Sequence, residues 1–244
     1  TAVCVCDSCA ARFRTEQGME IPKVIDWSGT AWTTFQTARE QWISGFVAEL
    51  METARQVRPG IAVTHNLAPG LRGWFQAQRA QDASLDDFAA GDLYGGFDEQ
   101  VFVLALMRGF RRRGMPEFMT TRTRDLFNHS STKSEHEMRT QAFAALAANS
   151  AFLFIDAVEP SGRLNEKVYE RIGRVFEATR KFEAETGGTE ITDVAVYYAD
   201  DSRIDETGVQ MLADAVPGGE SRHQDAVMGA VRALRRGHIP FSVV

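Results

Sequence analysis

Polar side chains that can exchange protons or hydrogen bonds follow several predicted strands, at the point where each strand ends. They are His65 and Asn66, Asp92 and Tyr94, Thr121 and Arg122, and Asp156. A parallel α/β barrel builds its active site in this way, from the carboxyl ends of several strands. The pattern therefore predicts one polar site that is assembled from four separate segments.

The three cysteines of the chain, Cys4, Cys6 and Cys9, all lie within the first nine residues. An odd, clustered set is not a disulfide framework. Neighbouring thiolates on one loop instead suit a soft cation such as zinc, which normally takes four ligands in a structural site. This chain shows three, so a fourth would come from elsewhere. The alternative is a trio of reduced thiols, which favours a cytoplasmic location.

Strands and helices alternate along the first part of the chain. Apolar runs predict strands over 61–64, 86–92, 117–121 and 151–155, and helical spacing predicts helices over 32–57, 98–113, 134–149 and 165–184. Successive strands begin about 30 residues apart, which is typical of βαβ units and a parallel sheet. The sheet is either an open doubly wound sheet or a barrel. No glycine-rich phosphate turn follows a strand, which weakens the dinucleotide-binding version.

A second α/β unit is predicted after Gly187 and Gly188, which read as a linker. It comprises a strand over 194–198, a helix over 222–236 and a strand over 239–244. Because the chain starts at Thr1 on a cysteine-rich loop and ends in an apolar run, we expect it to be an internal piece of a longer protein.

Composition excludes several classes of protein. The 244 residues are 44% hydrophobic and 25% charged, close to the globular average, so disorder is not expected. The net charge of −6 disfavours nucleic-acid binding, which needs clustered cations. No stretch reaches the roughly 18 to 20 apolar residues of a membrane span. Motifs of serine hydrolases, kinases and zinc proteases are missing from the sequence.

The segment 4–9, with Phe13 after it, resembles the cysteine loop that follows the fourth barrel strand in family 42 β-galactosidases and related glycoside hydrolases. The order of the following features is similar as well: a long helix, a strand ending at His65 and Asn66, then Trp74, then a strand leading to Asp92 and Glu99.

Two further segments extend the resemblance over nearly the whole chain. Residues 159–165 resemble the turn after the eighth strand in α-L-fucosidase-like hydrolases of families 29 and 151. Residues 191–244 resemble the start of the flavodoxin-like domain, related to class I glutamine amidotransferases, that acts as the trimerisation domain in family 42.

The resemblance implies an α/β fold in which residues 1–186 form the second half of a TIM (β/α)8 barrel. Residues 187–244 would begin a flavodoxin-like domain, and a homotrimer is implied. In the β-galactosidases the cysteine loop binds zinc with one more cysteine from upstream. The resemblance therefore implies a structural Zn²⁺ at Cys4, Cys6 and Cys9, with its fourth ligand outside this chain.

One departure bears on the reaction. Family 42 enzymes carry a nucleophilic Glu at the end of the seventh strand, whereas here that strand ends in Thr120, Thr121 and Arg122, and Glu117 lies at its start. The fucosidase-like families carry an Asp at the end of the fourth strand, which would lie upstream of Thr1. The resemblance thus implies a retaining, α-L-fucosidase-like glycosidase that acts on a terminal sugar. This chain alone would be inactive.

Two alternatives stay open. One is a β-galactosidase-like hydrolase, and the other is a non-catalytic barrel that binds glycans or serves in assembly. In both, as in the fucosidase-like interpretation, carbohydrate is the expected partner, and neither nucleic acid nor a membrane is.

Retaining hydrolysis needs an acid/base carboxyl about 5 to 5.5 Å from the nucleophile. Glu99, in the first turn of a predicted helix, and Asp92, at a strand end, are the candidates, and Asp92 could instead hold a sugar hydroxyl. Their alternatives are a carboxylate that interacts with the helix dipole and a turn residue.

The remaining candidates would bind the sugar. His65 and Asn66 would donate hydrogen bonds to hydroxyls, or else pack the loop. Trp74 or Tyr94 would offer a ring face, or else belong to the core. Arg122 would anchor a hydroxyl or an anionic group, and Asp156 would position other site residues.

Overall fold

The computed structural model describes residues 3–67, 73–110, 114–124, 130–158, 161–204, 208–215 and 221–244. Its helices are α1 (Asp7–Gln17), α2 (Thr30–Val57), α3 (Phe97–Gly109), α4 (Glu135–Ala147), α5 (Glu166–Arg180) and α6 (Arg222–Arg236). Its strands are β1 (Val24–Ile25), β2 (Ala90–Asp92), β3 (Glu117–Thr121), β4 (Ala151–Ile155), β5 (Val194–Val196), β6 (Gln210–Met211) and β7 (Phe241–Val243). Short 3-10 helices are η1 (Trp74–Gln76), η2 (Ala80–Ser84), η3 (Glu183–Glu185), η4 (Asp200–Ser202) and η5 (Leu212–Asp214). The fold is mixed α/β with parallel strands.

A parallel sheet with the order β2-β3-β4 lies at the centre of the chain. Its register places Asp92, Met119 and Leu153 in one row across the three strands. The predicted strands 117–121 and 151–155 are confirmed at their full length.

The segment 61–67 runs parallel to β2 without forming the regular strand that was predicted for 61–64. Asn66 forms a parallel bridge with Ala90, and the Leu67 amide donates to the Ala90 carbonyl at 2.8 Å. Before Asn66, a side chain replaces part of the backbone hydrogen bonding between the two segments, because the Val63 amide donates to the Asp87 carboxylate at 2.8 Å. For the same reason β2 covers only the last three residues of the predicted strand 86–92.

Helices cover one face of this sheet. Successive strand residues point to opposite faces, and Phe118 of β3 and Phe152 of β4 stack at 5.9 Å on the helix-covered side. Phe152 and Phe154 pack there against Met138 of α4. The opposite face carries the row of Asp92, Met119 and Leu153, and Leu153 is 40% exposed. We call this second face the uncovered face.

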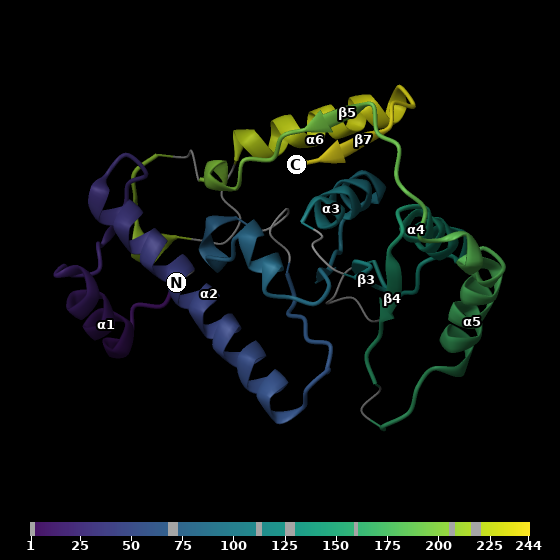
Figure 1. Cartoon of the computed structure of the whole chain (residues 1–244), viewed down its shortest axis with the longest axis horizontal. Coiled ribbons are helices and arrows are strands. Elements are labelled where there is room, and N and C mark those ends of the chain that lie inside the picture. Colours follow the sequence, from purple (N-terminus) through teal and green to yellow (C-terminus); the bar gives the residue numbers. More distant parts are fainter. Residues whose placement is uncertain are drawn as a thin grey trace.

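Helix α3 lies between the sheet and the C-terminal layer of β5, α6 and β7 (Figure 1). Its residues from Phe102 to Met107 are all buried. A helix that is apolar on all sides must be packed on all sides, and α3 meets β3 and α4 on one side and Val231 and Val243 on the other. Of the predicted helix 98–113, residues 111–113 lie outside the described ranges.

The N-terminal part differs from its prediction at two places. Residues 7–17 form α1 rather than a loop, and the helix begins directly after Cys6. Helix α2 is confirmed, but Phe46, Leu50 and Val57 of its predicted apolar face are exposed. The buried residues of α2 instead lie mainly in its first half, where Trp32 and Phe35 join an aromatic cluster with Phe13.

The C-terminal segment crosses from α5 to the side of α1 and α2 (Figure 1). Strands β5 and β7 pair in parallel, and β6 pairs antiparallel with β1, a pairing that was not predicted. The predicted linker is held by Asn149, whose side chain accepts from the Gly187 amide at 2.8 Å and donates to the Gly188 carbonyl at 2.9 Å. A domain boundary at residue 187 stays a prediction. Within the described ranges, no helix has the length and apolar character needed to cross a bilayer.

Candidate active site

Three of the predicted site residues meet at the carboxyl end of β2. The Asn66 amide donates to Asp92 Oδ1 at 2.5 Å, and the Tyr94 hydroxyl donates to Asp92 Oδ2. The Asp92 backbone amide returns a long contact of 3.4 Å to Asn66 Oδ1. Because Asp92 belongs to the row of the uncovered face, this hydrogen-bonded trio lies where a ligand could reach it. We refer to Asn66, Asp92 and Tyr94 as the Asp92 cluster.

Glu99 stands in the first turn of α3, as predicted. Its side chain folds back over the glycine turn that joins β2 to α3, so that its Oε2 lies 3.0 Å from the position a Cβ on Gly96 would take. The two glycines of this turn, Gly95 and Gly96, leave the space that the Glu99 side chain occupies. Glu99 forms no hydrogen bond or ion pair with any described residue, so its carboxyl can turn toward a ligand.

His65 and Asn66 do not act on the same face. Asn66 reaches Asp92, whereas His65 Nδ1 lies 2.8 Å from Oδ1 of Asp86. Adjacent residues of an extended chain point to opposite sides, which explains the split. The Asp86 side chain is completely buried, and Oδ2 of Asp86 and Nε2 of His65 have no hydrogen-bond partner within the described part of the chain. Sequence reasoning did not single out Asp86, because a lone acidic residue after a polar loop carries no pattern.

Arg122 and Asp156 pair with each other on the helix-covered side. Arg122 Nε lies 2.6 Å from Asp156 Oδ1, and the two side chains are only 9% and 5% exposed. Strand alternation places Arg122 on the face of Phe118, and Asp156 on that of Phe152 and Phe154. Arg122 also donates to the Thr132 hydroxyl at 2.9 Å. This packing favours a structural role for the pair, and its predicted contact with substrate stays a prediction.

Trp74 belongs to an aromatic cluster rather than to the Asp92 cluster. It is 5% exposed, and its ring lies 5.3 Å from Trp32 and 5.8 Å from Trp27, both edge-on. The segment that follows Trp74 does contact the Asp92 cluster, because the side-chain amide of Gln78 donates to the Asn66 carbonyl at 3.2 Å. The core alternative for Trp74 thus describes its packing better than a sugar platform does.

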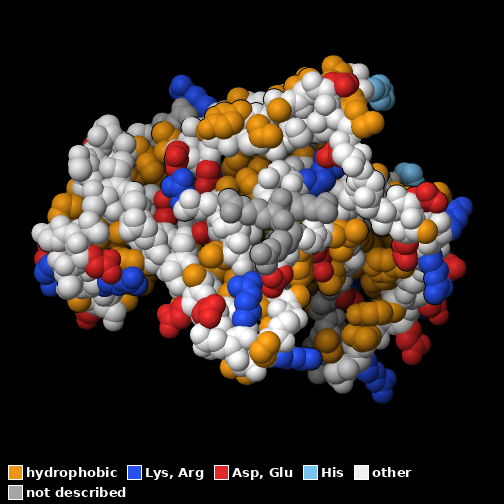
Figure 2. Space-filling view, viewed as in Figure 1, with side chains coloured by type: hydrophobic (Ala, Val, Ile, Leu, Met, Phe, Trp, Pro, Cys, Tyr) orange, Lys and Arg blue, Asp and Glu red, His pale blue; other side chains and the backbone are white. Residues whose placement is uncertain are grey.

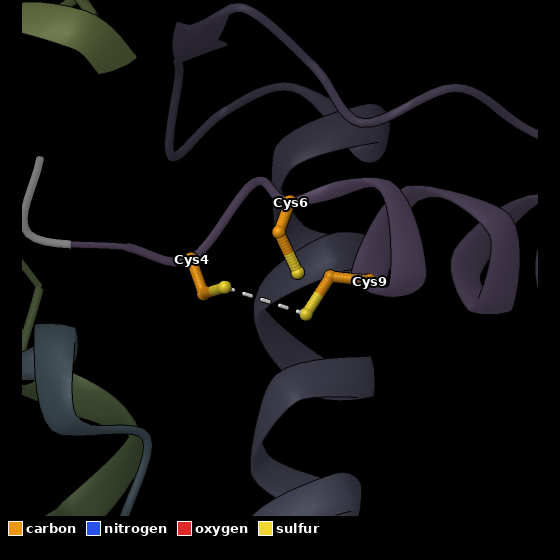
Figure 3. A group of neighbouring side chains, drawn as sticks. All are labelled: Cys4, Cys6 and Cys9. Carbon is orange, nitrogen blue, oxygen red and sulfur yellow. Dashed lines mark hydrogen bonds between the residues drawn. The ribbon is translucent and has the colours of Figure 1, made fainter.

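The three cysteines come together as the spacing suggested. Their sulfur atoms lie within 4.8 Å of one another, and the Cys9 and Cys4 sulfurs are 3.6 Å apart. Figure 3 shows the three side chains pointing toward a common point. Zinc–sulfur bonds of about 2.3 Å in a tetrahedron place sulfurs about 3.8 Å apart. The three thiols therefore fit one soft metal ion, and three is the number of ligands found among the described residues.

Local contacts shift the pKa values of Cys6 and Cys9 in opposite directions. Cys6 is the residue that precedes the helix, and the backbone N–H of Cys9 together with the Cys4 thiol lowers the pKa of Cys6. Burial and the neighbouring thiols raise the pKa of Cys9 to about 12. A helix N-terminus favours negative charge, so the geometry prepares Cys6 to bind a cation as a thiolate.

Similarity to known proteins is found among solved structures. No family model matches the chain, and no curated protein is significantly similar to it. Among solved structures, the chain is similar to α-L-fucosidase isoenzyme 2 from Paenibacillus thiaminolyticus, with a TM-score of 0.69 and 21% identity. The match covers 99% of this chain and 34% of that chain, so the chain spans about a third of the length of that enzyme. The likeness shows a shared fold, and none of these comparisons supports family 42.

Proposed function

We propose that this chain is part of an α-L-fucosidase-like glycoside hydrolase and supplies the Asp92 cluster to its sugar site. The observation that carries the proposal is the hydrogen-bonded trio of Asn66, Asp92 and Tyr94 on the uncovered face, in a chain whose fold is that of an α-L-fucosidase over 99% of its length. Ligands of α/β folds bind at the carboxyl ends of strands, which is where this trio lies.

The two carboxyls differ in what they can do. Both oxygens of Asp92 accept hydrogen bonds, from Asn66 and from Tyr94. The carboxylate is therefore fixed in a position from which it can accept a further hydrogen bond from a sugar hydroxyl. Glu99 has no such partner among the described residues and lies at the rim of the same turn. We therefore assign the acid/base role to Glu99 and the substrate-binding role to Asp92. A retaining mechanism would take its nucleophile from an Asp outside this chain.

The proposed architecture is a (β/α)8 barrel. The segment 61–67 and strands β2, β3 and β4 lie side by side and parallel, with helices on one face. In a closed barrel the uncovered face would line the interior, which would explain why Asp92 is directed there. The C-terminal segment would belong to a flavodoxin-like unit, and a trimer is part of the same proposal.

A structural zinc ion at Cys4, Cys6 and Cys9 completes the proposal, with the fourth ligand from outside the chain. The sulfur separations support it. A bound zinc would cross-link the loop to α1 and contribute directly to folding, as structural zinc sites do.

The test uses the intact protein and a panel of nitrophenyl glycosides. We expect release of nitrophenol from the α-L-fucoside. Glu99→Gln should lower kcat by about 10²–10⁴-fold, the usual contribution of a general acid. Asp92→Asn should act mainly by raising KM.

The matched control is Asp193→Asn, because Asp193 is exposed and its carboxylate forms no hydrogen bond or ion pair with any described residue. Its activity should equal that of the wild type. If the protein releases sugar from none of the glycosides but binds sugar saturably, the proposal of an enzyme is wrong and the protein is a glycan-binding protein. Equal activity of Glu99→Gln and the wild type would remove Glu99 from the mechanism.

A further inference from the structure

Apolar packing holds both ends of the cysteine loop in place. Val3, which directly precedes Cys4, is 3% exposed. Phe13, one helical turn after Cys9, is completely buried. Both belong to one buried cluster, in which the rings of Phe13 and Phe35 lie 5.0 Å apart. Because this packing does not involve the sulfur atoms, it keeps Cys4 and Cys9 close together whether or not a metal ion is bound.

The sulfur atoms of Cys4 and Cys9 are in direct contact. The Cys9 thiol donates to the Cys4 sulfur at 3.6 Å, and the sulfur of Cys6 lies within 4.8 Å of both (Figure 3). A disulfide has a sulfur–sulfur bond of about 2.05 Å, so the two sulfurs need to approach by about 1.5 Å. Cys4 precedes α1 and belongs to no helix or strand, so rotation about its side-chain bonds is not restricted by a helical turn.

The loop is also open to solvent. Cys4 and Cys6 are exposed, and Cys9 is half-buried. Helix α1 lies at one outer end of the molecule in Figure 1, and Figure 2 shows acidic and basic side chains gathered on the surface of that end. A small oxidant can therefore reach Cys4 from solvent and find the Cys9 thiol beside it. An accessible thiol next to a second one is the arrangement typical of reversibly oxidised cysteines.

We propose that Cys4 and Cys9 form a reversible disulfide when the metal-free protein meets hydrogen peroxide. The Cys4 sulfur attacks one peroxide oxygen, the O–O bond breaks, and one water leaves as Cys4 becomes a sulfenic acid. The Cys9 sulfur then attacks the Cys4 sulfur, the S–O bond breaks, and the hydroxide leaves with the Cys9 proton as a second water. The two thiols lose two electrons, and the peroxide gains them.

The disulfide and a bound metal ion exclude each other. Zinc binds cysteine as a thiolate, and the disulfide uses two of the three converging sulfurs. An exposed disulfide is readily reduced, so the loop can return to its metal-binding form. The disulfide itself depends neither on the proposed glycosidase activity nor on zinc, whereas its effect on metal content rests on the proposed zinc site.

The test is differential alkylation of the intact, metal-free protein after treatment with hydrogen peroxide. Remaining thiols are blocked with N-ethylmaleimide in urea, the disulfide is reduced with dithiothreitol, and the released thiols are labelled with iodoacetamide. Trypsin cuts after Arg12 and at no position between Cys4 and Cys9, so mass spectrometry of one fragment reads all three cysteines. We expect maleimide on Cys6 and the iodoacetamide label on Cys4 and Cys9.

Cys6→Ser and Cys4→Ser are matched variants, because each replaces one exposed thiol of the same loop. Cys6→Ser should form the disulfide at the rate of the wild type, whereas Cys4→Ser should form a disulfide at least tenfold more slowly. Zinc that is added before the peroxide should slow the wild type by a similar factor. Dithiothreitol added after the peroxide should restore three thiols that react with maleimide.

Four results would overturn the proposal. They are maleimide on all three cysteines after peroxide, a sulfinic acid on Cys4 in place of the disulfide, a disulfide that includes Cys6, and a disulfide that dithiothreitol does not reduce. Equal rates with and without zinc would overturn the exclusion between disulfide and metal. Because no readout uses hydrolysis, a protein without glycosidase activity that forms the Cys4–Cys9 disulfide keeps this inference and loses only the proposed function.

Discussion

At the scale of single residues, the partners of a side chain decide its role more than its type does. Asp92, Glu99 and Asp156 are carboxylates near the ends of strands or at the start of a helix. Asp92 accepts from two neutral donors, Glu99 has no partner among the described residues, and Asp156 is paired with buried Arg122. Only the first two have the freedom or the exposure that contact with a substrate requires.

The Arg122–Asp156 pair should contribute to stability. Asp156→Ala leaves the guanidinium of Arg122 buried without its counter-charge, and removing one partner of a buried pair costs about 3 to 5 kcal/mol. We expect a corresponding fall in the free energy of unfolding, measured by urea denaturation of the intact protein. The control is Glu177→Gln, since Glu177 pairs with Arg180 at the exposed surface and such pairs contribute little. Equal midpoints for both variants would argue against a structural role for Asp156.

The cysteines make a prediction about metal content. Cys9→Ser removes one of three converging sulfurs, so the purified intact protein should lose its zinc, measured by atomic emission against the wild type. Metal binding displaces protons from thiols, and the pKa of free Cys9 is raised to about 12. Zinc affinity of the wild type should therefore rise with pH over the range from 6 to 8 by competition with a chelator. A wild type that is purified without zinc and gains none on addition would refute the site.

At the scale of elements, one close backbone approach positions the Asp92 cluster. A Cβ on Gly91 would lie 2.1 Å from the Leu67 carbonyl oxygen and 2.8 Å from the end of the Met107 side chain. The missing side chain lets the segment 61–67 lie against β2 while α3 covers the strand. Asn66 reaches Asp92 only because this approach is possible.

Gly91→Ala should therefore move the segment 61–67 away from β2. Overpacking of this kind costs about 1 to 3 kcal/mol. The amide of Leu67, which donates to Ala90, should exchange faster with deuterium, and any glycosidase activity should fall. Gly173→Ala in α5 is the control, because a Cβ there meets nothing within 4 Å and alanine favours a helix by about 0.5 to 1 kcal/mol. Unchanged exchange at Leu67 in Gly91→Ala would contradict this account.

At the scale of the whole molecule, α3 joins two layers into one core. It packs on the central sheet with one side and on β7 and α6 with the other, within a single cluster of buried residues. The contact with β7 is close, because a Cβ on Gly109 would lie 2.2 Å from the Val243 carbonyl oxygen. The glycine at position 109 therefore allows β7 to pack closely against the end of α3.

Gly109→Ala should loosen this layer without disturbing the central sheet. We expect faster deuterium exchange at Tyr198 and Val244, which pair at the end of β5 and β7, and unchanged exchange within β3. Gly229→Ala in α6 serves as the control, because its Cβ would meet open space. Equal loss of protection in β3 and in the C-terminal layer would mean that the two layers unfold as one unit.

The sequence by itself determined the local structure. Apolar runs of buried residues and helical spacing placed β3, β4, α4 and α5 almost at their observed bounds, because these patterns reflect burial on one face of each element. Ser134 caps α4, because its side chain accepts from the Glu137 amide at 3.1 Å, and a serine followed three residues later by a glutamate is a signal that lies within one segment. The clustering of the three cysteines followed directly from their closeness in the chain.

Only the tertiary structure decided which side chains meet. The pairing of β1 with β6, the split of His65 from Asn66 and the partner Asp86 all depend on contacts between distant segments. The exposure of Phe46, Leu50 and Val57 shows the same limit, because a periodic pattern marks an apolar face without stating what covers it. Periodicity is a property of one segment, whereas a site is a property of several segments folded together.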